Sequence, residues 1–279
     1  MELKVFRTLW GVDEPIEEAA AKAARNGYDG IESRVPATNV EADQLQTALS
    51  AHNLAWIGEI CTGGDYVPPR HLTPAQHLQD LETALAMCAR LEPTRINCLG
   101  GLDAWDFDTS LAFLESGMAA AAHLELPLSF ETHRSRIFFN PWKTRDLVAR
   151  LPDIKLTADI SHWCVVAERL MDSEVETLTA IADNVTHIHA RVGYDQGPQV
   201  PHPAAPEYRH CLESHQRFWE LFWTRQSSAG ENLTTLTPEF GPDGYLHRLP
   251  FTEAPVADLF SINKWMAETE RAHFRRWQG

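Results

Sequence analysis

The chain has 279 residues, and its 44% hydrophobic and 23% charged residues are ordinary for a globular protein, which argues against disorder. Asp plus Glu number 39 against 24 Lys plus Arg, and the resulting net charge of −15 opposes nucleic acids and anionic membranes as main partners. The five cysteines are widely spaced and form no Cys-x-x-Cys pair, which argues against a disulfide framework or a thiolate zinc site.

The first predicted strand, Leu3 to Leu9, starts near the beginning of the chain, without the basic and apolar regions of a secretory signal. No run of residues approaches the ~18 apolar positions that a membrane span needs. We therefore expect a cytoplasmic protein with reduced cysteines and no membrane partner.

From this strand onward, strands and helices alternate. Asp13-Glu14-Pro15 and Thr73-Pro74 have the cap-then-proline pattern of helix starts. The predicted strands are Leu3 to Leu9, Tyr28 to Ser33, Leu54 to Ile60, Arg95 to Leu99, Leu128 to Thr132, Ile154 to Asp159, Val185 to Ala190 and Leu233 to Glu239. The predicted helices run from Asp13 to Asn26, Glu41 to His52, Thr73 to Leu91, Thr109 to Leu124, Thr144 to Arg150, Val165 to Ile181, His210 to Ser227 and Val256 to Arg276.

Eight strand–helix units predict a parallel sheet, and eight is the number that closes an α/β barrel. We therefore expect a single (β/α)8 TIM barrel that covers residues 1–279 as one domain. An open doubly wound sheet is the alternative. The absence of a G-x-G-x-x-G turn after the first strand and of a P-loop pattern speaks against it.

The segment from Val192 to Arg209 contains Pro198, Pro201, Pro203 and Pro206 and is expected to be an extended loop. Long ordered loops in compact domains are usually functional. We predict that it forms a lid or a partner contact over the mouth of the barrel.

Four consecutive predicted strands end on side chains of the metal-ligand type: Glu131, Asp159, His189 and Glu239. In a barrel these strand ends meet at one mouth, where converging carboxylates repel one another unless a cation lies between them. Oxygen-rich ligation with one imidazole favours Mn²⁺ or Mg²⁺, with Co²⁺ or Zn²⁺ as alternatives. We predict one divalent ion at these residues. Each acid alone could instead be a rim residue, and Asp159 could cap the next turn.

Further polar and aromatic residues surround the predicted mouth. His187 is expected to be a packed core histidine because it lies deeper in the strand than His189. Glu32 and Glu59 end the second and third strands and are either hydroxyl-binding groups or rim carboxylates. Candidates for stacking on a sugar face, or for ordinary packing, are Trp10, Trp105, Trp163, Phe138 and Tyr194.

The motifs Phe-Glu-Thr-His (Glu131 to His133), Asp-x-x-His (Asp159 to His162), His-x-His (His187 to His189) and Thr-Pro-Glu239 resemble the xylose-isomerase-like TIM barrel superfamily. The likeness points to its sugar isomerases and epimerases of the ketose 3-epimerase type. It implies that Glu131, Asp159, His189 and Glu239 hold a metal that stabilises an enediolate, while Glu131 and Glu239 move the proton. It also implies a carbohydrate substrate contacted by His133, His162 and Arg191, and by Trp10, Trp105 and Tyr194 where they stack.

The sequence departs from this family in two places. The family's arginine usually follows the metal histidine at a greater distance than Arg191 does, and a proline-rich insert, Gly193 to Pro206, takes that region. Substrate and reaction type therefore stay open, and a metal-dependent dehydratase or lyase acting on a keto-sugar or cyclitol is the first alternative. An endonuclease IV-like phosphodiesterase and a non-catalytic sugar-binding protein are further alternatives. The sequence leaves open whether the protein is a homo-oligomer.

Overall fold

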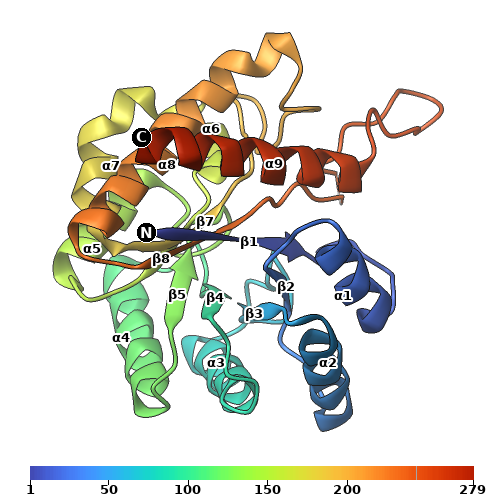
Figure 1. Ribbon diagram of the computed structural model, residues 1–279. Coiled ribbons are helices and arrows are strands. Elements are labelled where there is room, and N and C mark those ends of the chain that lie inside the picture. The colour runs from blue at the N-terminus through green and yellow to red at the C-terminus, as the bar shows by residue number, and fades with distance from the viewer. Residues whose placement is uncertain (243) are drawn as a thin grey trace.

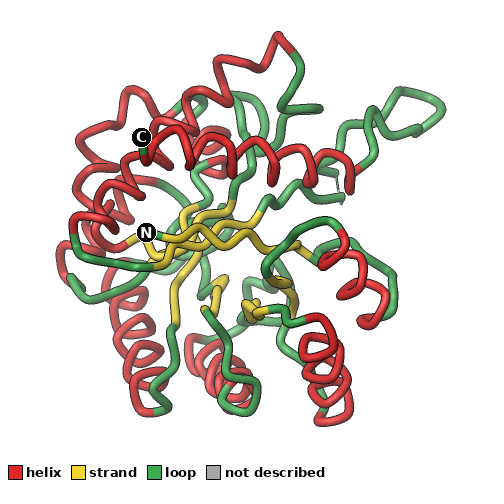
Figure 2. The backbone as a smooth tube through the Cα atoms, in the orientation of Figure 1, coloured by secondary structure: helices red, strands yellow, loops and turns green. Residues whose placement is uncertain are grey.

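Eight parallel strands form a closed barrel in which each strand pairs with the next and the last strand pairs with the first. The computed structural model describes residues 1–242 and 244–279. Figure 1 shows the strands at the centre and the helices around them, and Figure 2 distinguishes the two by colour. The strands are β1 (Glu2–Thr8), β2 (Gly30–Arg34), β3 (Ala55–Cys61), β4 (Arg95–Leu99), β5 (Leu128–Glu131), β6 (Leu156–Ala158), β7 (Val185–His189) and β8 (Leu233–Thr237).

Five of the described α-helices begin at a residue whose side chain caps the helix. Thr38 and Thr73 each form a capping box at the start of a helix, and Asp106, Asn140 and Asp258 each accept a backbone hydrogen bond from the first turn. The α-helices are α1 (Ile16–Arg25), α2 (Asn39–His52), α3 (Pro74–Cys88), α4 (Phe107–His123), α5 (Pro141–Arg150), α6 (Ser161–Ala167), α7 (Val175–Ile181), α8 (Arg209–Ser228) and α9 (Leu259–Gln278). The 3₁₀ helices are η1 (Met171–Glu174), η2 (Ala182–Asn184) and η3 (Pro206–Tyr208).

These elements confirm the predicted (β/α)8 barrel, and the open doubly wound sheet is wrong. The single helix predicted from Val165 to Ile181 is also wrong. Glu168 adopts a left-handed conformation with φ 51° and ends α6, and the chain resumes through η1 into α7. Glutamate rarely adopts this conformation, so its residue type gave no sign of a break.

Strand alternation divides the core into two layers. Apolar strand residues such as Val5, Ile31 and Phe130 belong to the large hydrophobic cluster, which also includes residues of the surrounding helices. On the alternate positions, Glu32 of β2 reaches His187 and His189 of β7, which are not neighbouring strands, so these side chains cross the barrel interior. The interior near the C-terminal strand ends is therefore polar.

The loop after β7 is irregular, as predicted from its prolines. Residues 190–205 contain no helix or strand, apart from a bridge between Tyr194 and Gly197. Gln199 accepts a hydrogen bond from Gly241 N at 2.9 Å and donates one to Gly241 O at 3.3 Å, so this loop supports the loop after β8. It starts at the C-terminal end of β7, on the predicted face of the barrel.

All five cysteines are buried and form no disulfide in the described structure. Within residues 1–242 and 244–279, no helix has both the length and the apolar character that crossing a bilayer requires.

Candidate metal and active site

Four ligand-type side chains converge at the C-terminal ends of β5 to β8. Glu131 is the last residue of β5 and His189 the last of β7, while Asp159 and Glu239 follow β6 and β8 directly or after one residue. Each offers one ligand atom, and these atoms all lie within 4.8 Å of one another. All four side chains are buried, with exposed fractions of 5% or less. The strand-end pattern in the sequence thus corresponds to one cluster in space.

The two carboxylate oxygens of Asp159 make different contacts. Its Oδ1 accepts a hydrogen bond from Ser161 N at 3.0 Å and another from the Ser161 hydroxyl, at the start of α6. Its backbone N–H donates to Thr132 Oγ1 at 2.8 Å, which holds the end of β6 against the end of β5. The Oδ2 atom lies 2.5 Å from Arg191 Nη2 and 3.8 Å from His162 Nε2. Asp159 therefore supports the next turn and is also part of the site.

His189 joins the cluster through Nδ1. This nitrogen lies 3.0 Å from Glu239 Oε2 and 3.7 Å from Glu131 Oε1, and it has no hydrogen-bond partner in the described structure although the ring is fully buried. The other ring nitrogen, Nε2, contacts Glu32 Oε1 at 2.9 Å. Burial opposes a charged ring, but the surrounding carboxylates hold the pKa of His189 above its ordinary value.

Arg191 provides a positive charge at the same place. Its Nη2 lies 2.5 Å from Asp159 Oδ2 and 3.6 Å from Glu239 Oε2, and it donates to His162 Nε2 at 2.6 Å. Because Nε2 of His162 accepts this bond, the proton of the neutral ring lies on Nδ1, which has no partner in the described structure. Burial and nearby cations lower the pKa of His162, so the ring is neutral.

The two glutamates have opposite tendencies to ionise. Burial raises the pKa of Glu239 to about 7, despite the positive charges of His189 and Arg191. Burial also acts on Glu131, but His189 and the Asn97 amide, which donates to Glu131 Oε2 at 2.6 Å, hold its pKa below the ordinary value. Two carboxylates with separated pKa values are suited to acid and base roles.

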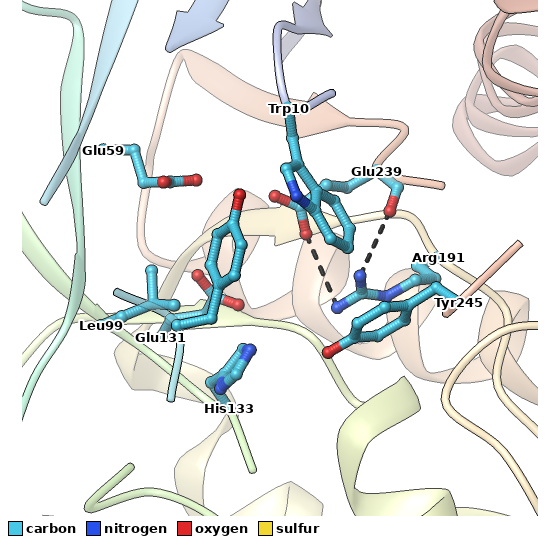
Figure 3. A pocket seen from close by; sticks show the side chains of 9 residues that line it. Trp10, Glu59, Leu99, Glu131, His133, Arg191, Glu239 and Tyr245 are labelled. Carbon is cyan, nitrogen blue, oxygen red and sulfur yellow. Dashed lines mark hydrogen bonds and ion pairs between the residues drawn. The ribbon is translucent and has the colours of Figure 1, made fainter. Parts of the chain in front are cut away.

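Aromatic side chains from three loops close the mouth (Figure 3). Trp10 contacts Tyr66 and Tyr245 edge-on at ring-centroid distances of 5.3 and 5.0 Å, and the Arg191 guanidinium lies 4.9 Å from the Tyr245 ring. The free volume beneath them is about 10 Å³, less than a sugar needs. It is lined by Trp10, Glu59, Tyr66, Leu99, Glu131, His133, Arg191, Glu239 and Tyr245.

Most of the predicted site residues meet here, but two do not. His133 and Trp10 line the pocket, and the rings of His133 and His162 lie 3.9 Å apart. Trp105 packs against His77 and Phe113 at 5.1 and 5.4 Å, away from the pocket. Tyr194 packs against Tyr208 and His247 at 5.9 and 6.3 Å. Neither ring lines the pocket.

The structure also resolves the alternatives for Glu32, Glu59 and His187, and it adds two tyrosines that the sequence did not identify. Glu32 is 2% exposed, so it is an interior residue and not a rim carboxylate, and Glu59 is 8% exposed and lines the pocket. His187 is a buried core residue, as expected, with Nδ1 2.8 Å from Thr235 Oγ1. Tyr66 and Tyr245 follow β3 and β8, and their positions after barrel strands were the only available signal.

The donor set suits a divalent ion. Three carboxylates and one imidazole lie at mutual distances that a single ion can bridge, and the unpartnered Nδ1 of His189 faces only carboxylate oxygens. Arg191 opposes it, because its guanidinium occupies the Asp159 oxygen that such an ion would take.

The chain is similar to known proteins in sequence and in fold. The family model described as "Xylose isomerase-like TIM barrel" matches residues 20–203. No curated protein matches the chain. A D-allulose 3-epimerase from Methylomonas sp., solved in complex with D-allulose, is 14% identical, with a TM-score of 0.67 and 97% of both chains covered.

Two further structures share the fold. A xylose isomerase-like TIM barrel protein from Mycobacterium smegmatis, in complex with magnesium, is 12% identical, with a TM-score of 0.64 and 97% of both chains covered. Endonuclease IV from Thermus thermophilus is 12% identical, with a TM-score of 0.59 and coverage of 98% of this chain and 99% of that one. Identities this low establish the fold alone.

Proposed function

Because the chain belongs to the xylose isomerase-like TIM barrel family, we propose that it is a divalent-metal-dependent isomerase or epimerase acting on a ketose or keto-sugar. One observation carries the proposal: the buried cluster of Glu131, Asp159, His189 and Glu239, whose ligand atoms lie within 4.8 Å of one another. The likeness to a D-allulose 3-epimerase supports the choice of a sugar substrate.

The same four residues would hold the ion, with Mn²⁺ or Mg²⁺ favoured by three carboxylates and Co²⁺ or Zn²⁺ as alternatives. The magnesium complex of a related barrel supports this choice. A bound ion would polarise the substrate carbonyl and so acidify the neighbouring C–H.

Glu131 and Glu239 would carry the proton. In the metal-free protein the pKa of Glu131 is lowered and that of Glu239 is raised, which favours Glu131 as the proton acceptor and Glu239 as the donor, and a bound ion would lower both pKa values. His133, His162 and Arg191 would hydrogen-bond substrate oxygens, and Trp10 would lie against a sugar face. The closed mouth would have to open for entry and would then exclude water.

The alternatives differ in the product. A dehydratase or lyase would remove the same proton and then expel a hydroxyl group as water. The endonuclease IV-like role has a structural neighbour in its favour, but the net charge of −15 opposes binding to DNA. The cytoplasmic location and a homo-oligomeric state remain predictions.

The deciding experiment uses a panel of ketoses, keto-sugars and inososes in D₂O with Mn²⁺. Deuterium should enter at the carbon next to the carbonyl, without loss of water. Glu131→Gln and Glu239→Gln should each lower the exchange rate by about 10²- to 10⁴-fold, the usual contribution of a general acid or base.

Glu270→Gln is the matched control, because Glu270 is also a fully buried, hydrogen-bonded glutamate but lies on α9, away from the site. It should keep the wild-type exchange rate. Full activity in both site variants would remove these glutamates from the mechanism, and exchange followed by loss of water would identify a dehydratase.

A further inference from the structure

We propose that Glu32 is a positioning residue for the metal site: it keeps a proton of His189 on Nε2, so that Nδ1 is the ring nitrogen available to an ion at the carboxylate cluster. The inference rests on the proposed metal-dependent function. It adds a residue on β2, across the barrel interior from the strands β5 to β8 that bear the four ligands.

The geometry assigns the protons of two histidines. Glu32 Oε1 lies 2.9 Å from His189 Nε2, and Glu32 Oε2 lies 3.2 Å from His187 Nε2. An ionised carboxylate only accepts hydrogen bonds, so both rings donate from Nε2. The hydroxyl of Thr235, 2.8 Å from His187 Nδ1, is placed to donate to that nitrogen, which is consistent with the same tautomer.

The second ring nitrogen of His189, Nδ1, shows the consequence of this tautomer. This nitrogen is buried, has no hydrogen-bond partner in the described structure, and faces the oxygens of Glu239 and Glu131 at 3.0 and 3.7 Å. In the metal-free protein the positively charged ring can carry a proton on this nitrogen, and an ion bound between the carboxylates would replace that proton and take the lone pair. Without Glu32, the proton could move to Nδ1 and donate to Glu239, which would remove the nitrogen ligand.

Glu32 is also suited to this task by its burial. It is 2% exposed, and the two imidazole donors replace the water that a buried carboxylate loses. Replacing a carboxylate that orients a metal-ligating histidine usually lowers the affinity for the metal by about 10- to 100-fold.

The first experiment needs no variant. In ¹⁵N-histidine-labelled protein, the ring nitrogens of His189 are assigned by comparison with His189→Gln and followed during titration with Zn²⁺, which is diamagnetic. We expect the Nδ1 resonance to move while Nε2 keeps its proton. A metal-induced shift at Nε2 with a proton on Nδ1 would overturn the inference, whether or not any variant folds.

The second experiment measures Mn²⁺ affinity by calorimetry. Glu32→Gln keeps the volume but offers an amide that can donate to Nε2, so affinity should fall by about 10- to 100-fold. Thr235→Val removes the side-chain partner of His187 Nδ1 and leaves the contacts of His189 intact, so it should leave the affinity within about twofold of wild type.

The outcomes separate this inference from the function on which it rests. If the wild type and the folded Glu32→Gln variant bind Mn²⁺ equally, Glu32 has no positioning role and the proposed function stands. If the wild type binds none of the candidate ions, the proposed function fails and the inference fails with it.

Discussion

Arg191 places a buried positive charge where three carboxylates converge. Its exposed fraction is 1%, and its guanidinium contacts Asp159 and Glu239 directly. Together with His189, it provides the positive charge that these carboxylates need when no ion is bound. The same contact means that an incoming ion and Arg191 compete for one oxygen of Asp159.

We therefore expect Arg191→Gln to tighten Mn²⁺ binding by about tenfold or more. Two unit charges 4 Å apart interact by about 4 kcal/mol at an effective dielectric constant of 20, and tenfold in affinity corresponds to about 1.4 kcal/mol. Calorimetry measures the change. Arg134→Gln is the control, because Arg134 stacks on Tyr245 at 4.8 Å without an ion pair to the cluster among the described contacts. Weaker binding by Arg191→Gln would show instead that the guanidinium organises the metal site.

The raised pKa of Glu59 predicts that the stability of the metal-free protein depends on pH. Burial raises its pKa to about 8 from an ordinary value of 4.5, with help from Glu239 and Glu131 and against the opposing charge of Arg34. Between these two pH values the folded protein binds more protons than the unfolded chain, so the free energy of unfolding falls as pH rises from about 4.5 to 8.

Since a pKa difference of one corresponds to about 1.4 kcal/mol, we expect the free energy of unfolding to fall by an amount on the order of a few kcal/mol. Urea unfolding at pH 5 and at pH 8.5, with a chelator present, measures it. Glu59→Gln cannot ionise and should lose less stability over this range. Identical pH profiles for the wild type and Glu59→Gln would mean that the Arg34 ion pair keeps Glu59 ionised throughout.

The sequence identified the proposed metal ligands better than the residue that orients one of them. Glu131, Asp159, His189 and Glu239 could be recognised because residues at matching strand ends of a parallel barrel must face one mouth. Glu32 shares that strand-end position, but its role depends on contact with a strand that is not its neighbour. Such a contact depends on how the barrel closes, which no local pattern in the sequence reveals.

At the scale of elements, the strands and the irregular loop after β7 were predicted well, whereas the packing of side chains on the loops was not. Hydrophobic runs and proline or capping signals located all eight strands, whereas the break at Glu168 and the positions of Trp105 and Tyr194 depend on tertiary packing. The mouth is likewise formed by loops packed on one another, with Trp10 lying on the backbone of Gly241.

Gly241→Ala tests this packing. A Cβ at this position would lie 1.8 Å from Trp10 Cζ3, so the indole or the β8 loop must move. Overpacking of this kind costs about 1–3 kcal/mol, which chemical denaturation can measure. Trp10→Phe removes the clashing atoms, so in a double-mutant cycle the two substitutions should be strongly non-additive. Additive effects would show that Trp10 does not rest on Gly241.

At the scale of the whole molecule, the candidate site connects half of the barrel. Its four ligand-type residues come from the four consecutive strands β5 to β8, and Glu32 extends the contacts to β2. An ion bound by residues from all four strands would stabilise short strands the most, such as β6, whose register shifts between Leu156 and Thr157. Metal binding and barrel stability should therefore be coupled.

Removal of the metal should accordingly lower the melting temperature. An ion that binds only the folded state stabilises it by about 2.7 kcal/mol at a concentration 100 times its Kd. For a chain of this size, we expect chelation to lower the melting temperature by several degrees from its value with saturating Mn²⁺. Scanning calorimetry across a Mn²⁺ series measures this. In Glu131→Gln/Glu239→Gln, which lacks two charged ligands, the melting temperature should no longer depend on Mn²⁺, whereas Glu270→Gln should keep the full dependence from a lower starting value. A Mn²⁺-dependent rise that persists in the double variant would place the stabilising ion elsewhere in the protein.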